Sequence, residues 1–179
     1  STRKESSAAS DVYKRQIMDF DRFGVLSEPG MDPGEIRQVI SAAKARGMSV
    51  MAHANGAETV RAAAEAGVDT VEHGAYLDRD ALQACADNGV IWVPTLSAIG
   101  NLRGKGRFSE PDVERILASA MENVALYASM GGLIAPGTDA GAWAVPHGSL
   151  TEYALLKECL GSGWETLLER GARALEARF

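Results

Sequence analysis

Short apolar runs alternate with amphipathic stretches along the chain, and this alternation is the feature that most restricts its fold. Five runs with the composition of β-strands begin at Ile17, Ser49, Thr70, Val90 and Leu133. A stretch with apolar residues at helical spacing follows each run. Strands that alternate with helices predict βαβ units and a parallel sheet. We therefore expect an α/β fold, either a doubly wound sheet or part of a (β/α)8 barrel.

The helical stretches carry start and stop signals. Asp32 is a suitable N-cap with Pro33 at the first helical position, and Gly47, Gly67 and Gly89 are suitable stops. The predicted helices span residues 32–47, 57–67, 78–88, 110–130, 150–160 and 164–177.

Polar residues end four of the predicted strands, namely His53, His73, Thr95 and Asp139. Active sites of barrels are built at the carboxyl ends of their strands, so this placement favours a partial barrel over an open sheet. Two neutral imidazoles and a carboxylate suit a divalent metal such as zinc, with positions left open for water. A carboxylate beside metal-polarised water can take its proton. The residues therefore predict a metal site of His53, His73 and Asp139, with Asp139 as the catalytic base.

Each of these residues also has a simpler interpretation. A single His after a strand, or Asp139 within "GTDAG", is often a hydrogen-bonded turn residue. The joint occurrence of three such residues at strand ends favours the metal site. His147 follows the last predicted strand and is expected to lie over the mouth of the barrel, where it would contact substrate or carry a proton. A role as a surface-loop residue fits it equally well. Thr95 is the second residue predicted to contact substrate.

At these positions the motifs "HANG", "EHG", "VPTL" and "GTDAG…PHG" resemble those of the amidohydrolase superfamily, in its imidazolonepropionase and prolidase-like branch. The resemblance implies a (β/α)8 barrel that binds one or two divalent metal ions. His53 matches the His that ends the fifth strand, and His73 matches the His that ends the sixth. Asp139 matches the Asp of the eighth strand, which is both ligand and general base. The implied reaction is hydrolysis of a C–N bond in an amide, a cyclic amide or a dipeptide-like substrate.

Two elements of that family pattern are missing. The family's first strand carries a His-x-His pair, and many members have a metal-bridging Lys on the fourth strand. This chain contains no His-x-His pair, and "IMDFD", in the fourth-strand position, contains no Lys. We therefore expect residues 17–179 to form strands four to eight of a barrel. Such a fragment is expected to be inactive by itself, and to associate or aggregate through open sheet edges at "IMDFD" and "LIAPG".

The first sixteen residues differ from the rest of the chain. They show no apolar periodicity, and residues 6–16 resemble a translated transposase adapter of the kind used to prepare sequencing libraries. We expect residues 1–16 to be a disordered or artefactual tail, outside the folded domain.

The composition restricts the partners. The net charge of −6 gives no basic face for a nucleic acid or an anionic membrane, and no apolar run approaches a membrane span. The two cysteines are far apart and are expected to be free thiols in a cytoplasmic protein. The expected partner is a small-molecule substrate. The alternatives are a non-catalytic α/β module that binds a small molecule or a partner at the same rim, and, with less support from the "GKG" stretch, a phosphate-binding barrel.

Overall fold

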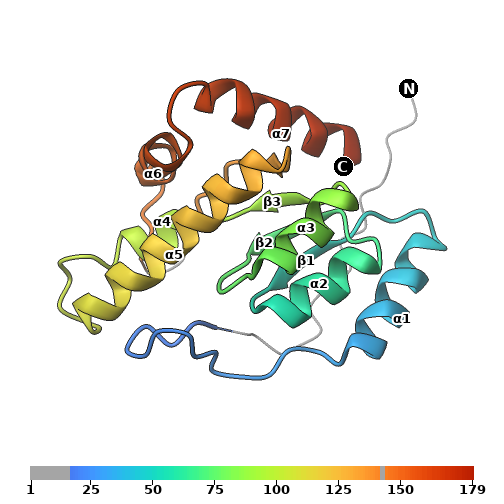
Figure 1. Cartoon of the computed structure of the whole chain (residues 1–179), viewed down its shortest axis with the longest axis horizontal. Coiled ribbons are helices and arrows are strands. Elements are labelled where there is room, and N and C mark those ends of the chain that lie inside the picture. The colour runs from blue at the N-terminus through green and yellow to red at the C-terminus, as the bar shows by residue number, and fades with distance from the viewer. Residues whose placement is uncertain (1–16, 142–143) are drawn as a thin grey trace.

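A parallel sheet lies at the centre of the fold. The computed structural model describes residues 17–141 and 144–179 (Figure 1). Within these residues the strands lie in the order β1-β2-β3-β4, and neighbouring strands pair in parallel. Their bounds are β1 Met51–Ala54, β2 Thr70–His73, β3 Ile91–Val93 and β4 Leu133–Ile134. The predicted α/β class with a parallel sheet is confirmed, and the tail expected at residues 1–16 lies outside the described residues.

The helices follow the predicted stretches closely. Asp32 caps the first one: its carboxylate accepts a hydrogen bond from the Gly34 N–H at 2.7 Å, and the Glu35 side chain bonds back to the Asp32 N–H. The sequence does not predict α4, because a helix of five residues is too short to show periodicity. No helix of the described part of the chain could cross a membrane. The bounds are α1 Pro33–Lys44, α2 Ala57–Glu65, α3 Arg79–Asp87, α4 Leu96–Gly100, α5 Glu110–Ser129, α6 Thr151–Leu160 and α7 Trp164–Arg178.

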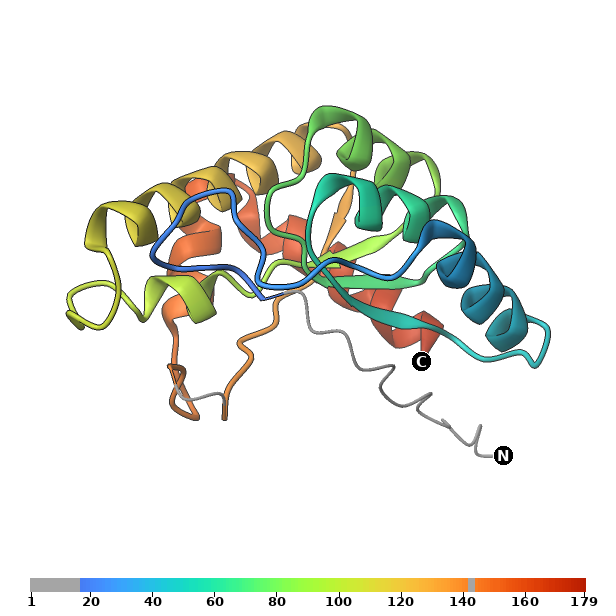
Figure 2. The ribbon, with the colours of Figure 1, turned by 90° about the horizontal axis from the view of Figure 1, so that it is seen from below.

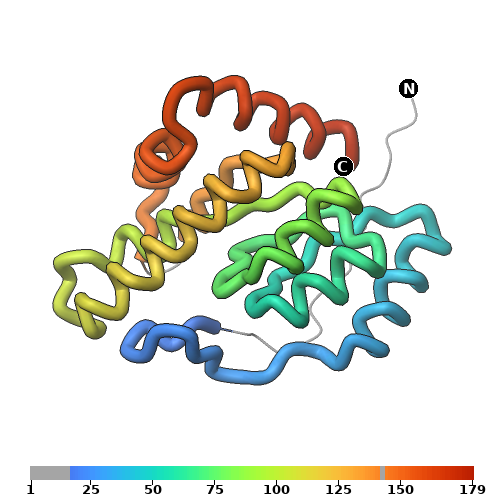
Figure 3. The backbone as a smooth tube through the Cα atoms, in the orientation of Figure 1, coloured from blue at the N-terminus to red at the C-terminus, as the bar shows by residue number. Residues whose placement is uncertain are grey.

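The strand predicted at "IMDFD" is wrong. Met18 makes an isolated antiparallel bridge with Leu26, and the chain between them turns back on itself. Asp19 stabilises this turn, because its carboxylate accepts a backbone N–H two residues further on at 3.0 Å. The Phe23 N–H donates to the Asp112 carboxylate at 3.1 Å, so the turn lies beside the start of α5 (Figure 3). Asp19 therefore makes a turn bond, and Asp21 accepts a hydrogen bond from the Ser109 N–H at 2.8 Å, so neither aspartate extends the sheet.

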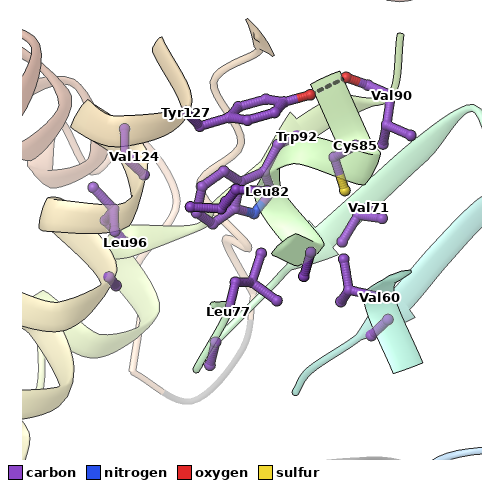
Figure 4. Packing of buried hydrophobic residues seen from close by; sticks show 14 of the residues in the cluster. Val60, Val71, Leu77, Leu82, Cys85, Val90, Trp92, Leu96, Val124 and Tyr127 are labelled. Carbon is purple, nitrogen blue, oxygen red and sulfur yellow. Dashed lines mark hydrogen bonds between the residues drawn. The ribbon is translucent and has the colours of Figure 1, made fainter. Parts of the chain in front are cut away.

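One face of the sheet is covered by α2, α3 and α5 (Figure 2). At its centre the Trp92 and Tyr127 rings meet edge to face, with centroids 5.6 Å apart (Figure 4). The Tyr127 hydroxyl donates to the Val90 carbonyl at 2.7 Å, which satisfies its one polar group inside the core. Leu82 and Val71 are buried beside these rings. Val71 therefore faces the helices on this side of the sheet.

Within residues 17–141 and 144–179, the opposite face of the sheet is covered on the side of β3 and β4 alone. There Ile91, Val93 and Ala135 form a second, smaller cluster, and Ala174 and Leu175 of α7 pack against it. Figure 2 shows α7 on the side of the sheet away from α2 and α3. α7 thus shields the Val93 side chain from water.

The two edges of the sheet differ. The Ile134 carbonyl points away from β3, because the next residue, Ala135, donates its N–H to the Trp92 carbonyl at 3.0 Å. α7 lies against this carbonyl so closely that a Cβ on Gly171 would be 1.8 Å from its oxygen. The edge expected to be open at "LIAPG" is therefore covered by α7. At the other edge β1 pairs only with β2 among the described strands, and Met51 is 56% exposed.

Replacing Gly171 with Ala is expected to lower the free energy of unfolding by about 1–3 kcal/mol, because the added methyl group meets a backbone carbonyl that cannot move without distorting β4. Urea denaturation of the two chains measures this difference. Gly100→Ala is the matched control, since Gly100 is also helical and a Cβ there would meet the flexible end of a side chain, the Leu155 Cδ1, at 2.7 Å rather than backbone. Equal stability of the wild type and Gly171→Ala would contradict the close packing of α7 on β4.

Candidate active site

Two histidines come together at the carboxyl end of the sheet. In the β1–β2 ladder His53 lies opposite Glu72, and Ala54 lies opposite His73. The two histidines thus end neighbouring strands, and their imidazole rings have a centroid distance of 4.3 Å, with their planes at 68°. His53 is exposed on the uncovered part of the sheet, whereas His73 is partly buried. The chain thus forms a pair of imidazoles at the end of the sheet where α/β proteins carry their active sites.

His73 is held on three sides. Its Nδ1 lies 2.7 Å from the Thr95 Oγ1, within hydrogen-bond distance. Its carbonyl accepts a hydrogen bond from the Trp92 Nε1 at 3.0 Å. Next to it, a Cβ on Gly74 would lie 2.5 Å from the same Trp92 nitrogen, so only Gly fits between His73 and the indole. Within the described part of the chain, the contact at Nδ1 leaves Nε2 as the ring nitrogen without a hydrogen bond.

The imidazole of His73 is neutral near pH 7. Burial is the main cause that lowers its pKa to about 4, and the nearby charge of His53 lowers it further. A neutral imidazole is the form that binds metal ions, and a hydrogen bond at one ring nitrogen determines which tautomer presents the other. The environment of His73 therefore suits it to be a metal ligand through Nε2.

The side chains at the strand ends leave the sheet through strained backbone. His73, Thr95 and Asp139 have φ angles of 68°, 50° and 51°, in the left-handed region that non-glycine residues rarely adopt. Thr95 is predicted above to contact substrate. Its side chain is buried, and its hydroxyl is within bonding distance of His73, so it orients the imidazole in this structure. Contact of Thr95 with substrate stays a prediction.

Asp139 and His147 lie in the segment that follows β4. The ring of His147 comes close to Gly141, where a Cβ would be 3.5 Å from its Cε1 and Nε2 atoms, so His147 folds back toward the Asp139 segment. In residues 17–141 and 144–179, no group of three or more His, Cys, Asp or Glu side chains is placed to hold a metal ion. The structure therefore pairs His53 with His73 but does not bring Asp139 into a three-residue cluster with them. The role of Asp139 as third ligand and base stays a prediction.

Sequence reasoning missed a buried carboxyl group close to the site. Glu152 of α6 is fully buried, and its Oε2 accepts a hydrogen bond from the Ser97 N–H at 2.6 Å. Burial raises the pKa of Glu152 to about 7, while hydrogen bonds from Ser97 and Leu96 oppose the shift. A signal was present, since Glu152 lies three and four residues before Leu155 and Leu156, on the apolar face of its helix.

The cysteines take no part in the site. Cys85 and Cys159 are free thiols, as predicted. Burial raises the pKa of Cys85 to about 12 and that of Cys159 to about 11. Since the thiolate is the reactive form, neither residue is a nucleophile near neutral pH.

Comparison with known proteins identifies the family of the chain. The family model described as the amidohydrolase family matches residues 3–179. The chain belongs to the amidohydrolase family, and its sheet is part of that family's barrel, as the motifs predicted.

Relatives share the fold over a part of their length. A solved Xaa-Pro dipeptidase with bound methionine in its active site is 30% identical, with a TM-score of 0.71 over 84% of this chain and 39% of its own. A candidate prolidase from Bifidobacterium longum is 26% identical, with a TM-score of 0.72 over 91% of this chain and 44% of its own. An uncharacterized protein of Mycobacterium tuberculosis is 28% identical over 149 residues, 80% of this chain and 40% of the relative. The chain thus spans about two fifths of the length of these relatives, and its structural neighbours are prolidase-like amidohydrolases.

The low pKa of His73 is open to direct measurement. We expect its ring signals in an NMR titration to report a pKa near 4, below the ordinary value for His. His53→Gln should raise this pKa only in part, because burial is the larger cause of the shift. The unfolded chain binds this proton below about pH 6.5, whereas the folded chain binds it only near pH 4. The stability due to His73 should therefore decrease as the pH is lowered from about 6.5 to about 4.

His147→Gln is the matched control for that titration, since it removes the third histidine of the chain and leaves the environment of His73 unchanged. A His73 pKa restored to its ordinary value by His53→Gln would show that burial is not the main cause.

Proposed function

We propose that the complete protein that contains this chain is a metal-dependent hydrolase that cleaves a C–N bond in an amide, a cyclic amide or a dipeptide-like substrate. The observation that carries the proposal is the pair of imidazoles, His53 and His73, 4.3 Å apart at the carboxyl end of the sheet. Membership of the amidohydrolase family supports hydrolysis. The likeness to a Xaa-Pro dipeptidase supports a C–N bond as the bond that is cleaved.

The donor groups at this end of the sheet fit a divalent metal ion such as zinc. His73 is neutral and has its Nδ1 occupied by Thr95, so it would bind the ion through Nε2. His53, with its ring beside that of His73, would be the second ligand. Catalytic zinc sites have three protein ligands and keep a position for water. Asp139 is the proposed third ligand from this chain, and the part of the family fold that this chain does not span would supply any others.

The proposed chemistry divides among these residues. A bound divalent ion lowers the pKa of a coordinated water and polarises a carbonyl group. The Asp139 carboxylate would take the proton of the attacking water and deliver it to the leaving nitrogen. The Thr95 hydroxyl would keep the His73 ring in the orientation that the ligand needs. His147, next to Gly141, would contact the substrate.

Substitutions in the complete protein test these roles. His53→Ala and His73→Ala should reduce the metal bound per chain, as measured by inductively coupled plasma mass spectrometry. Asp139→Asn should lower kcat by at least about 100-fold, because it removes the proposed base. His147→Ala is the control, since it should leave the metal bound and change only kcat or KM.

Two results would contradict the proposal. Equal metal loss from His147→Ala and His53→Ala would show that His147 is a ligand and not a substrate contact. A complete protein that takes up no divalent ion would instead favour the non-catalytic alternative, a module that binds a small molecule or a partner at the same rim.

The chain by itself is expected to bind zinc weakly, to hydrolyse no amide and to associate through β1. Only two imidazoles converge among the described residues, and β1 presents an unpaired edge with Met51 exposed. Light scattering after size exclusion should show oligomers, and Met51→Lys should reduce them, because a charge on an edge strand opposes pairing. A monomeric chain that hydrolyses an amide with stoichiometric zinc would contradict this expectation.

A further inference from the structure

Glu152 is a buried carboxyl group that the proposed chemistry does not use. It lies in the first turn of α6, and its exposed fraction is 0%. One of its oxygens accepts a hydrogen bond from the Ser97 N–H at 2.6 Å, while the other, Oε1, has no partner among the residues that the structure describes. Burying a carboxyl group with an unpartnered oxygen is unfavourable, and an apolar residue of similar size would avoid this. The position of Glu152 therefore calls for a role other than general stability.

The hydrogen bond that Glu152 accepts comes from the turn in which the chain enters α4 after β3. This turn comprises Thr95, Leu96 and Ser97, and all three residues are buried. The Ser97 N–H lies in the first turn of α4, where backbone N–H groups have no partner within the helix. Without an acceptor from α6 this buried N–H would be unsatisfied, and the turn would lose the contact that determines its position.

Two further bonds lead from the same turn to the candidate site. The Thr95 Oγ1 lies 2.7 Å from the Nδ1 of His73. The Ser97 hydroxyl donates to the Thr138 carbonyl at 2.8 Å, directly before Asp139. One turn thus contacts both the imidazole that ends β2 and the backbone that carries the carboxylate after β4.

The backbone at both ends of this network is strained. Thr95 and Asp139 have φ angles of 50° and 51°, and Thr is a β-branched residue, for which this region is especially unfavourable. Such conformations persist only when surrounding contacts hold them. Glu152 of α6 provides such a contact for the turn that contains Thr95.

We propose that Glu152 is a positioning residue: it holds the 95–97 turn in place, so that Thr95 orients the His73 imidazole and Ser97 orients the backbone before Asp139. Its value for catalysis rests on the proposed function, but the orientation of His73 can be measured without any activity. The group acts through the turn and touches neither histidine of the pair.

The test reads the tautomer of His73 in the 179-residue chain labelled with 15N-histidine. The chain has three histidines, so its ring nitrogen signals can be assigned, by solution NMR or by magic-angle-spinning NMR if the chain associates. The wild type should show one dominant tautomer of His73. Glu152→Leu fills the same space without an acceptor, and it should reduce the ratio of the two tautomers about three- to tenfold, as expected for loss of one hydrogen bond. Glu152→Gln keeps an acceptor oxygen and should restore the wild-type ratio.

Leu156→Ala is the matched control, because it removes buried packing from the same helix and leaves the acceptor of the Ser97 N–H in place. It should lower stability and leave the His73 tautomer ratio unchanged, whereas Glu152→Leu should fold and change the ratio. An unchanged ratio in Glu152→Leu would overturn the proposal, as would an equal change in Leu156→Ala. A Glu152→Leu chain that does not fold would also overturn it, since the carboxyl group would then be a determinant of folding.

The complete protein separates this inference from the proposed function. If it is a hydrolase, Glu152→Leu should lower kcat while KM stays within about twofold, and Glu152→Gln should recover most of kcat. A changed tautomer ratio together with an unchanged kcat would overturn the positioning role. A wild-type protein with no hydrolase activity would refute the proposed function alone, because the tautomer ratio would still report whether Glu152 positions His73.

Discussion

The parallel pairing of β1 with β2 is the interaction on which the site depends. Its register sets His53 and His73 at the same end of neighbouring strands, and there the centroids of the two rings lie 4.3 Å apart. A shift of β1 by one residue would turn His53 to the face covered by helices, because side chains alternate along a strand. The buried contacts of α2 and α3 oppose such a shift, since Ala54 and Val71 face these helices within the core. The core that stabilises the fold is therefore also what aligns the two imidazoles.

The site side chains are presented where the strands end, and the backbone there is strained. His73 is supported by the indole of Trp92, and Thr95 by the turn that Glu152 holds. These supports come from β3 and α6, which are distant in sequence from His73. Contacts from neighbouring elements thus keep these side chains oriented, although the conformation of their own backbone is unfavourable.

The sequence predicted the regular parts of the fold well. Capping and stop signals gave α1 within a few residues of its observed bounds, because these signals act over one helical turn. The same reasoning failed at "IMDFD", where Asp19 bonds to the backbone two residues further on and Asp21 accepts from the Ser109 N–H, contacts that apolar patterning does not reveal. It also failed at the β4 edge. Gly171 lies within α7, and only the structure shows that it lets this helix lie against the Ile134 carbonyl.

The sequence by itself determined the class of the fold, the helices, and the histidines and aspartate that end the strands, since these follow from local periodicity and from motifs of a few residues. Only the tertiary structure decided which of them meet. It paired His53 with His73, brought the Thr95 hydroxyl within hydrogen-bond distance of the His73 imidazole and buried Glu152 against Ser97. Ser97 and Glu152 are 55 residues apart, and their contact depends on how α6 packs against the turn after β3. No local pattern determines such packing, because it results from the burial of all the apolar faces together.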